Sequence, residues 1–220
     1  MMHIGIDFDD TLLDTRRVFV RILNEIHGTN HQLEDLHDYY LMGTFGCTAE
    51  YLESVFTRHF EELHASEPFP GVQTAIKQAQ TCGHVITIIT ARPAIHMPPL
   101  YQWLARHDLP SDRVISASKS GEKALRAAEA KIDIFVDDNP RHALALAARG
   151  IRVLLLDRPY NRNCQDPNIT RVPDWTAIRE ILVPSTEDEA TSFNPTKAGL
   201  LADTESTRTK SLMQKGSPCP

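Results

Sequence analysis

The chain has 220 residues, of which 41% are hydrophobic, and it carries a formal net charge of -6. This composition is sufficient for a buried core in a globular protein. The acidic balance and the lack of a basic run exclude a surface for nucleic-acid polymers, because clustered Lys and Arg must face the phosphates of such a partner.

Targeting and redox signals are absent from the sequence. No stretch approaches the roughly 18 consecutive apolar residues of a membrane span, and the N-terminus lacks the charged and apolar segments of a secretory signal. The four cysteines lie far apart without CxxC spacing, so we expect free thiols at Cys47, Cys82, Cys164 and Cys219. These features predict a cytoplasmic location and no membrane partner.

Short apolar segments alternate with helical patterns along most of the chain. Strands are expected at residues 3–8, 84–90, 113–116, 132–138 and 151–157. Pro98 is positioned to open a helix that runs to about His107, and Pro140 and Gly150 bracket another. The alternation predicts an α/β fold with a Rossmann-like, doubly wound parallel sheet.

Two segments depart from this alternation. Residues 14–70 contain helical patterns at 16–28, 33–42 and 48–65 but no strand, so we expect a small helical cap inserted after the first strand. From Pro184 onward, Ser, Thr, Pro and charged residues dominate, which is typical of a disordered tail. The predicted organisation is an α/β core at 1–13 and 71–183, a cap at 14–70 and a tail at 184–220.

Carboxylates cluster after the first predicted strand, in the sequence "HIGIDFDDTLLDT". Its D-x-D-x-T pattern places Asp7 and Asp9 at the carboxyl edge of the sheet, where open α/β sheets bind ligands. Carboxylates this close repel one another unless a cation lies between them, and Mg²⁺ prefers such hard oxygen ligands. A solvated loop or a helix N-cap would explain the same residues without chemistry.

Three further features lie at the same predicted edge. Thr90 ends the second strand, Asp137 and Asp138 end the fourth, and either Lys119 or Lys123 lies near a helix N-terminus. Each has a purely structural alternative. Thr90 could satisfy a turn, Asp138 could be a helix N-cap before Pro140, and either lysine could be solvated. Their combination, in this order, favours one shared site.

The order "DFDDT", "ITAR", a lysine and "VDDNP" resembles the four motifs of the haloacid dehalogenase superfamily, which consists mostly of Mg²⁺-dependent aspartyl phosphatases. The resemblance spans residues 4 to about 140. The chain is more closely similar to the 5'(3')-deoxyribonucleotidase family and its bacterial nucleotidase relatives, whose later part resembles "LLLDRPYNR" and "ITRVPDWTAI".

The resemblance implies a role for each motif residue. Asp7 would be the nucleophile that forms an aspartyl-phosphate, and Asp9 the general acid and base, a role that suits a carboxyl group with a raised pKa. Mg²⁺ would be held by Asp7, the Asp9 backbone carbonyl and Asp137, with Asp138 as a water-mediated partner. Asp9 also favours a phosphatase over a dehalogenase, whose leaving group needs no proton. Asp10 receives no role.

The remaining implied contacts concern the substrate. Thr90 would bind a phosphoryl oxygen, and Lys123, preferred to Lys119, would supply positive charge. Arg92 would either contact substrate or pair with a surface carboxylate.

Substrate choice is expected to depend on the cap, where four side chains would either stack on a base or pack the cap helices together: Tyr39, Tyr40, Met42 and Phe45. The histidines form no HxxxH or HxH pattern beside the acidic residues. The expected partner is a small phosphorylated metabolite, and a nucleoside monophosphate is favoured. A sugar phosphate or another small phosphomonoester is the alternative, as is a catalytically idle phosphate-binding regulatory module.

Overall fold

The computed structural model describes residues 1–183, which lie in one compact unit. Within this range six strands form one parallel sheet in the order β3-β2-β1-β4-β5-β6. The strands are β1 (His3–Ile6), β2 (Val85–Thr90), β3 (Arg113–Ser116), β4 (Ile134–Asp137), β5 (Arg152–Leu156) and β6 (Ile169–Val172). The predicted parallel α/β fold is confirmed, and the predicted disordered tail lies outside the described residues.

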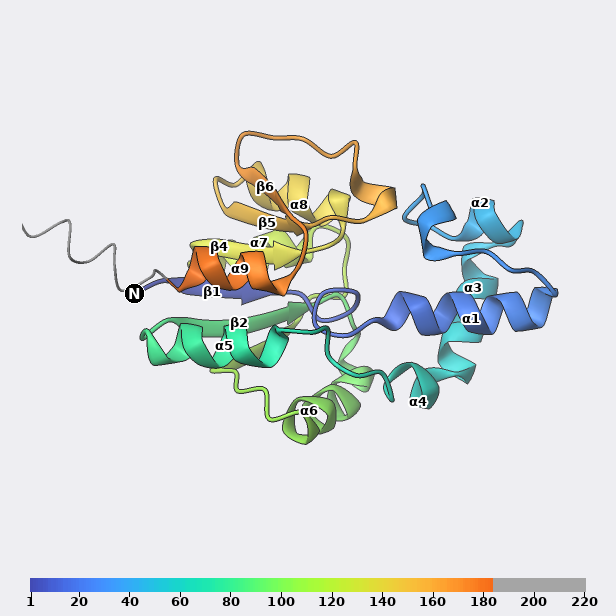
Figure 1. Ribbon diagram of the computed structural model, residues 1–220, viewed down its shortest axis with the longest axis horizontal. Coiled ribbons are helices and arrows are strands. Elements are labelled where there is room, and N and C mark those ends of the chain that lie inside the picture. Colours follow the sequence, from blue (N-terminus) through green and yellow to red (C-terminus); the bar gives the residue numbers. More distant parts are fainter. Residues whose placement is uncertain (184–220) are drawn as a thin grey trace, which may run out of the picture. The chain divides into compact units, whose positions relative to one another are not determined.

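Helices cover both faces of the sheet (Figure 1). One face carries α5 (Val72–Thr81), α6 (Met97–Arg106) and α9 (Trp175–Leu182), with α5 and α9 side by side. The other face carries α7 (Glu122–Glu129) and α8 (Pro140–Ala147). Because the central strands are buried from both sides, their sequences are continuous apolar runs, as in "VITIIT".

Residues 14–70, here called the helical insertion, have an apolar cluster of their own. The segment contains α1 (Thr15–His27), a 3₁₀ turn at Leu33–Asp35, α2 (Met42–Phe45), α3 (Ala49–Arg58) and α4 (Phe60–Leu63). The segments that enter and leave it lie side by side, since the Phe69 backbone N–H donates to the Leu12 carbonyl at 2.9 Å. The proposed boundaries between core and cap at 13/14 and 70/71 stay a prediction.

Three local expectations were wrong. No continuous helix covers 33–42, because the Asp38 carboxylate accepts the backbone N–H of Tyr40 in a local turn and the chain becomes helical again only at Met42. The helix expected at 48–65 is interrupted at His59, which ends α3 and precedes α4. Strand β6 was not expected. It lies at the edge of the sheet and only Val172 of its four residues is buried, so its sequence has little apolar pattern.

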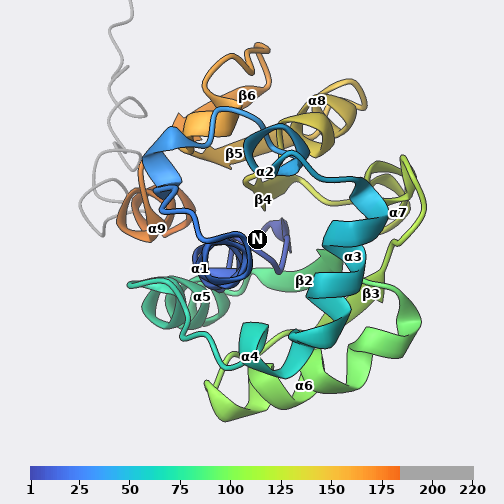
Figure 2. The same cartoon turned by 90° about the vertical axis from the view of Figure 1, so that its right-hand side faces the viewer.

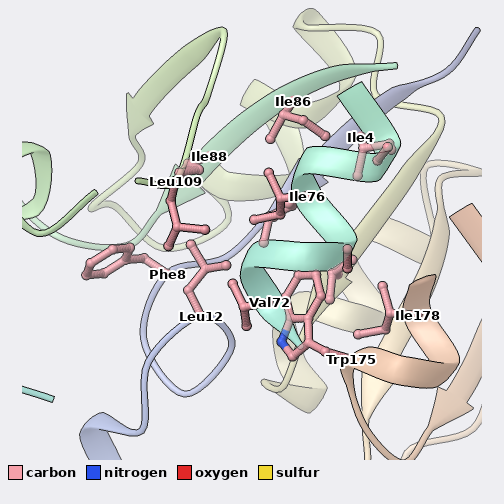
Figure 3. Close-up of a cluster of buried hydrophobic side chains, with 14 of the residues drawn as sticks. Ile4, Phe8, Leu12, Val72, Ile76, Ile86, Ile88, Leu109, Trp175 and Ile178 are labelled. Carbon is pink, nitrogen blue, oxygen red and sulfur yellow. The ribbon is translucent and has the colours of Figure 1, made fainter. Parts of the chain in front are cut away.

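The loop after β1 is held in place by the core beneath it (Figure 3). Trp175 of α9 is 1% exposed, and its indole N–H donates to the Thr11 carbonyl at 2.8 Å. The Phe8 ring packs edge-on against Trp103 of α6, with centroids 5.1 Å apart. Apolar packing therefore fixes the segment that carries Asp7 and Asp9.

Close packing also explains the glycine in β1. A Cβ at Gly5 would lie 2.3 Å from the Phe135 ring and 3.0 Å from Ile132. We expect Gly5→Ala to lower the free energy of unfolding by about 1–3 kcal/mol, because the rigid ring has to shift. Chemical denaturation measures this, with Gly43→Ala as the control, since nothing lies within 4 Å of a Cβ at that position in α2. Equal stabilities of the two variants would contradict the packing argument.

Two further observations concern the cysteines and the membrane propensity of the described residues. Cys47, Cys82 and Cys164 are free thiols, and Cys219 lies outside the described residues. Of the helices within residues 1–183, none has the combined length and apolarity that a bilayer span requires.

Candidate active site

Parallel pairing brings three predicted residues to one edge of the sheet. Asp7 directly follows β1, Thr90 ends β2 and Asp137 ends β4, and both β2 and β4 are hydrogen-bonded neighbours of β1. The Asp7 backbone N–H continues the ladder by donating to the Val136 carbonyl at 2.9 Å. Figure 2 views this end of the molecule, with α1 and α3 of the helical insertion in front of the strand ends.

Lys123 lies between the two carboxylates. Its Nζ is 2.8 Å from Oδ1 of Asp7 and 3.1 Å from Oδ2 of Asp137. All three side chains are buried, and Lys123 comes from the first turn of α7. Lys119 is exposed outside the helix, so Lys123 is the lysine that the fold brings to the carboxylates.

Burial and the shared ammonium set the protonation of this cluster. Burial is the main cause that raises the pKa of Asp7 to about 6, against the lowering effect of Lys123. For Asp137, burial would raise the pKa, but Lys123, His142 and the Asn139 N–H lower it to about 2. Despite burial, the two carboxylates raise the pKa of Lys123, so this lysine stays a cation. One positive charge thus faces two acidic groups.

The donor set at this edge fits a divalent cation. Asp7, Asp137 and His142 each offer one ligand atom, and these atoms lie within 4.8 Å of one another. Nδ1 of His142 is buried without a hydrogen-bond partner. Carboxylate oxygens suit Mg²⁺. A divalent cation would also compensate the negative charge of the two carboxylates that the single ammonium of Lys123 does not neutralise.

Asp9 is paired with Arg92. Arg92 donates from Nε to Oδ2 at 2.7 Å and from Nη2 to Oδ1 at 2.5 Å, and the Thr15 hydroxyl donates to Oδ1 at 2.8 Å. Burial alone would raise the pKa of Asp9, but the Arg92 guanidinium and the hydroxyl bring it below its usual value. The expectation of a raised pKa was therefore wrong for this arrangement, because the carboxylate has a bidentate cationic partner.

Arg92 and Thr90 are both buried, at 4% and 0% exposure. Oγ1 of Thr90 accepts the backbone N–H of Arg92 at 3.2 Å, and the Arg92 guanidinium lies over the Phe8 ring at 4.5 Å. Arg92 thus pairs with a carboxylate of the site rather than with one on the surface. One of its nitrogens, Nη1, is buried without a partner.

Asp138 and Asp10 hold neighbouring loops. The Asp138 carboxylate accepts from the Tyr160 hydroxyl at 2.7 Å and from the Thr11 hydroxyl at 3.3 Å, so its water-mediated metal contact stays a prediction. Asn139, not Asp138, caps α8. Asp10 accepts from the backbone N–H of Arg16 at 2.6 Å and from its Nε at 3.1 Å.

Arg16 links the helical insertion to the core. Its guanidinium lies 4.8 Å from the ring centroid of Tyr39, in the insertion, and 4.1 Å from that of Tyr160, in the core. The ion pair with Asp10 fixes this guanidinium at the start of α1. Asp10, which received no role from the sequence, therefore anchors the first helix of the insertion.

Buried carboxyl groups make stability depend on pH. Burial raises the pKa of Asp10 and of Asp138 from the ordinary value of 3.8 to about 7 in the folded chain. The folded state then binds more protons than the unfolded state between these values, so the stabilisation present below about pH 4 is lost as the pH rises through 7. We expect the free energy of unfolding of the metal-free protein to fall from pH 5 to pH 8.

Urea denaturation in EDTA at several pH values measures this slope, whose upper limit is about 1.4 kcal/mol per pH unit for each proton. Asp138→Asn should flatten the slope, whereas Asp14→Asn, at the half-buried N-cap of α1, should keep it. A stability that rises between pH 5 and 8 would contradict the prediction.

A cleft of about 390 Å³ opens beside these residues. Asp7, Asp9 and Arg92 line it on the core side, and the aromatic rings that line it are Phe19, Tyr39, Tyr40, Phe56 and His96. Met42 and Phe45 do not line the cleft, and Phe45 is buried in the apolar cluster of the insertion, as the packing alternative predicted.

The sequence interpretation missed Phe19, Phe56 and His142. Phe19 lies one helical turn after Thr15, whose hydroxyl binds Asp9, so both side chains lie on the same side of α1. Its ring packs edge-on against Phe56, with centroids 5.7 Å apart. His142 follows the fourth motif closely, but no spacing rule singled it out.

Known proteins are similar to this chain in sequence and in fold. The family model described as 5' nucleotidase, deoxy (pyrimidine), cytosolic type C protein matches residues 1–187. A Bacillus cereus protein named "Putative nucleotidase" is 30% identical over 193 residues, covering 82% of this chain and 98% of its own length. A nucleotidase of Clostridium acetobutylicum is 24% identical, with 82% and 93% covered.

Solved structures at lower identity show the same fold. A haloacid dehalogenase-like protein of Agrobacterium tumefaciens matches with a TM-score of 0.60 at 12% identity, covering 88% of this chain and all of its own. A Haemophilus somnus protein described as a "predicted phosphoglycolate phosphatase" matches with a TM-score of 0.56 at 16% identity, covering 82% of this chain and 97% of its own. The chain is a hydrolase of the phosphatase and nucleotidase kind, and it belongs to the 5' nucleotidase, deoxy (pyrimidine), cytosolic type C family.

Proposed function

We propose that the chain is a Mg²⁺-dependent phosphatase that releases phosphate from (deoxy)nucleoside 5'-monophosphates through an aspartyl-phosphate intermediate. The observation that carries this proposal is the buried group of Asp7, Lys123 and Asp137 beside a cleft with aromatic walls. Family membership supports the nucleotide, and a Bacillus subtilis haloacid dehalogenase-type hydrolase with the same fold (TM-score 0.54, 15% identity) is described as bound to magnesium.

Charge neutralisation is the main requirement of this reaction, since an anionic nucleophile must reach an anionic phosphoryl group. Asp7, the Asp9 backbone carbonyl and Asp137 would hold Mg²⁺, which when bound supplies positive charge between nucleophile and phosphate. Lys123, in contact with Asp7 at 2.8 Å, would supply a second positive charge, and Thr90 would donate its hydroxyl to a phosphoryl oxygen.

The two steps divide between Asp7 and Asp9. A carboxylate oxygen of Asp7 bonds to phosphorus while the ester P–O bond breaks, and Asp9 gives a proton to the leaving oxygen. Water then attacks the aspartyl-phosphate, Asp9 takes the proton, and inorganic phosphate leaves. Asp9 can carry that first proton only after its pair with Arg92 opens, and a bound phosphate would compete for the same guanidinium.

Phosphate release from a matched panel tests the substrate. Pyrimidine and purine (deoxy)nucleoside 5'-monophosphates are compared with sugar phosphates and glycerol phosphate, each with and without Mg²⁺. We expect kcat/KM to be highest for nucleotides and to be lost in EDTA. Equal values for sugar phosphates would remove the nucleotidase proposal and keep the phosphatase, and absence of turnover on every ester would favour the idle regulatory module. A cytoplasmic location stays a prediction.

Aromatic stacking predicts the effect of a cleft variant. Phe56→Ala should raise KM for nucleoside monophosphates about tenfold, because stacking of a base on an aromatic ring contributes about 1–3 kcal/mol. KM for glycerol phosphate should change little, since that substrate has no base. Tyr101→Ala, at an exposed position of α6 outside the cleft lining, is the control. An equal rise for both substrates would mean that Phe56 shapes the cleft without contacting a base.

A further inference from the structure

His142 has a buried nitrogen without a partner beside the carboxylates. It lies in the first turn of α8, five residues after Asp137, and its side chain is 28% exposed. Nδ1 is 3.6 Å from Oδ2 of Asp137, which is beyond hydrogen-bond distance, and it has no other hydrogen-bond partner among the described residues. Because a buried polar atom without a partner costs free energy, this nitrogen is placed to receive a ligand.

The position of His142 relative to the other donors suggests which ligand this is. Within residues 1–183, Asp7, Asp137 and His142 are the group of metal-binding side chains whose ligand atoms gather within 4.8 Å. Ligand bonds of about 2.1 Å to one ion require donor atoms within about 4.2 Å, so a shift of a few tenths of an ångström completes the set. His142 also lines the cleft, which gives a cation a path from solvent.

We propose that His142 is a third protein side-chain ligand of the divalent cation and that its imidazole nitrogen shifts the site's preference from Mg²⁺ toward Mn²⁺, Co²⁺ and Ni²⁺. The inference rests on the proposed function, which places a cation at Asp7 and Asp137. Mg²⁺ binds oxygen ligands and gains little from imidazole, whereas later first-row divalent ions bind nitrogen increasingly well. The site therefore combines hard and intermediate donors.

The alternative is that the ring only packs against the carboxylate. Protonated His142 would be attracted to Asp137, but Lys123 already binds the same oxygen at 3.1 Å. A positioning role of this kind would affect the binding of every divalent cation similarly, since it would act through Asp137. The change in the ratio of Co²⁺ to Mg²⁺ affinity when the imidazole is removed separates the two explanations, because loss of a nitrogen ligand weakens Co²⁺ binding much more than Mg²⁺ binding.

The test uses the full chain stripped of metal with EDTA and then dialysed. Isothermal titration calorimetry measures binding of Mg²⁺ and of Co²⁺ to the wild type, His142→Ala and His142→Asn. We expect His142→Ala to lose about 10–100-fold in Co²⁺ affinity and less than about threefold in Mg²⁺ affinity. His142→Asn, whose amide offers an oxygen, should bind Mg²⁺ like the wild type and Co²⁺ weakly.

His96→Ala is the matched control, since His96 lines the same cleft but is not in the donor group. It should leave both affinities unchanged, and thermal denaturation of the metal-free variants establishes that each is folded. Equal loss of both ions, or no loss of either, in the two His142 variants would overturn the inference.

Failure of the proposed function has a different signature. A wild type that binds neither ion overturns both the metal site and the role of His142. A wild type that binds Mg²⁺ and releases phosphate, together with an unaltered Co²⁺ to Mg²⁺ ratio in His142→Ala, overturns the role of His142 alone.

Discussion

Asp7→Asn is expected to reduce kcat by at least about 1,000-fold while the protein stays folded. The amide matches the carboxylate in shape but has no charge with which to attack phosphorus, so the covalent step is lost. The fold should persist, because Lys123 keeps its contact with Asp137 at 3.1 Å. Phosphate release under saturating nucleotide and Mg²⁺ measures the loss.

Asp14→Asn is the matched control for this variant. Asp14 lies in the same acidic segment, but its carboxylate caps α1 by accepting the Arg17 N–H, a role that Asn fills about equally well. Activity should stay within about twofold. If Asp7→Asn kept the activity of this control, Asp7 would not be the nucleophile and the proposed mechanism would fall.

Lys123→Met is expected to have the largest effect on stability. The substitution keeps the apolar stem but leaves Asp7 and Asp137, at 6% and 0% exposure, without their cation. Breaking a buried ion pair by removing one partner costs about 3–5 kcal/mol, and the pKa of both carboxyl groups should rise. Urea denaturation in EDTA measures the loss, and phosphate release should fall with it.

Lys119→Met separates the two lysines of the motif. Lys119 is exposed and contributes a backbone N–H to Glu122, a bond that the substitution keeps. We expect a change in stability below about 0.5 kcal/mol and nearly unchanged activity. Addition of Mg²⁺ should restore part of the stability of Lys123→Met, because a divalent cation replaces the missing positive charge. Equal losses of stability in the two lysine variants would contradict the claim that the buried ammonium of Lys123 stabilises the carboxylates.

Contacts between arginines and aromatic rings join the helical insertion to the core beside the cleft. Arg141 of α8 donates to the Tyr40 hydroxyl at 3.1 Å, and Arg16 lies against Tyr39 and Tyr160, so the helical insertion contacts the core through cationic and aromatic groups. Such contacts are worth about 0.5–2 kcal/mol each. They hold Tyr39 and Tyr40 at the cleft while Phe19 and Phe56 come from helices α1 and α3.

The sequence by itself determined five of the six strands of the sheet and the positions of three motif residues. Apolar runs mark the strands, and parallel strands with the same direction must bring their carboxyl ends to one edge, so Asp7, Thr90 and Asp137 had to meet there. Proline at the start of α6 and of α8 fixed those helices locally, because its ring presets the backbone of the first turn. The strands and the helix starts depend on neighbours within a few residues, and the meeting of the three motif residues then follows from parallel pairing.

Only the tertiary structure decided which of several chemically similar side chains reaches the site and which partner it has there. Lys119 and Lys123 have the same chemistry, and burial of one face of α7 selected Lys123. The pair of Arg92 with Asp9 joins residues 83 positions apart and reverses the expected direction of the Asp9 pKa. The ring of Phe19 and the unpartnered nitrogen of His142 are likewise placed by packing between distant elements, which local periodicity does not record.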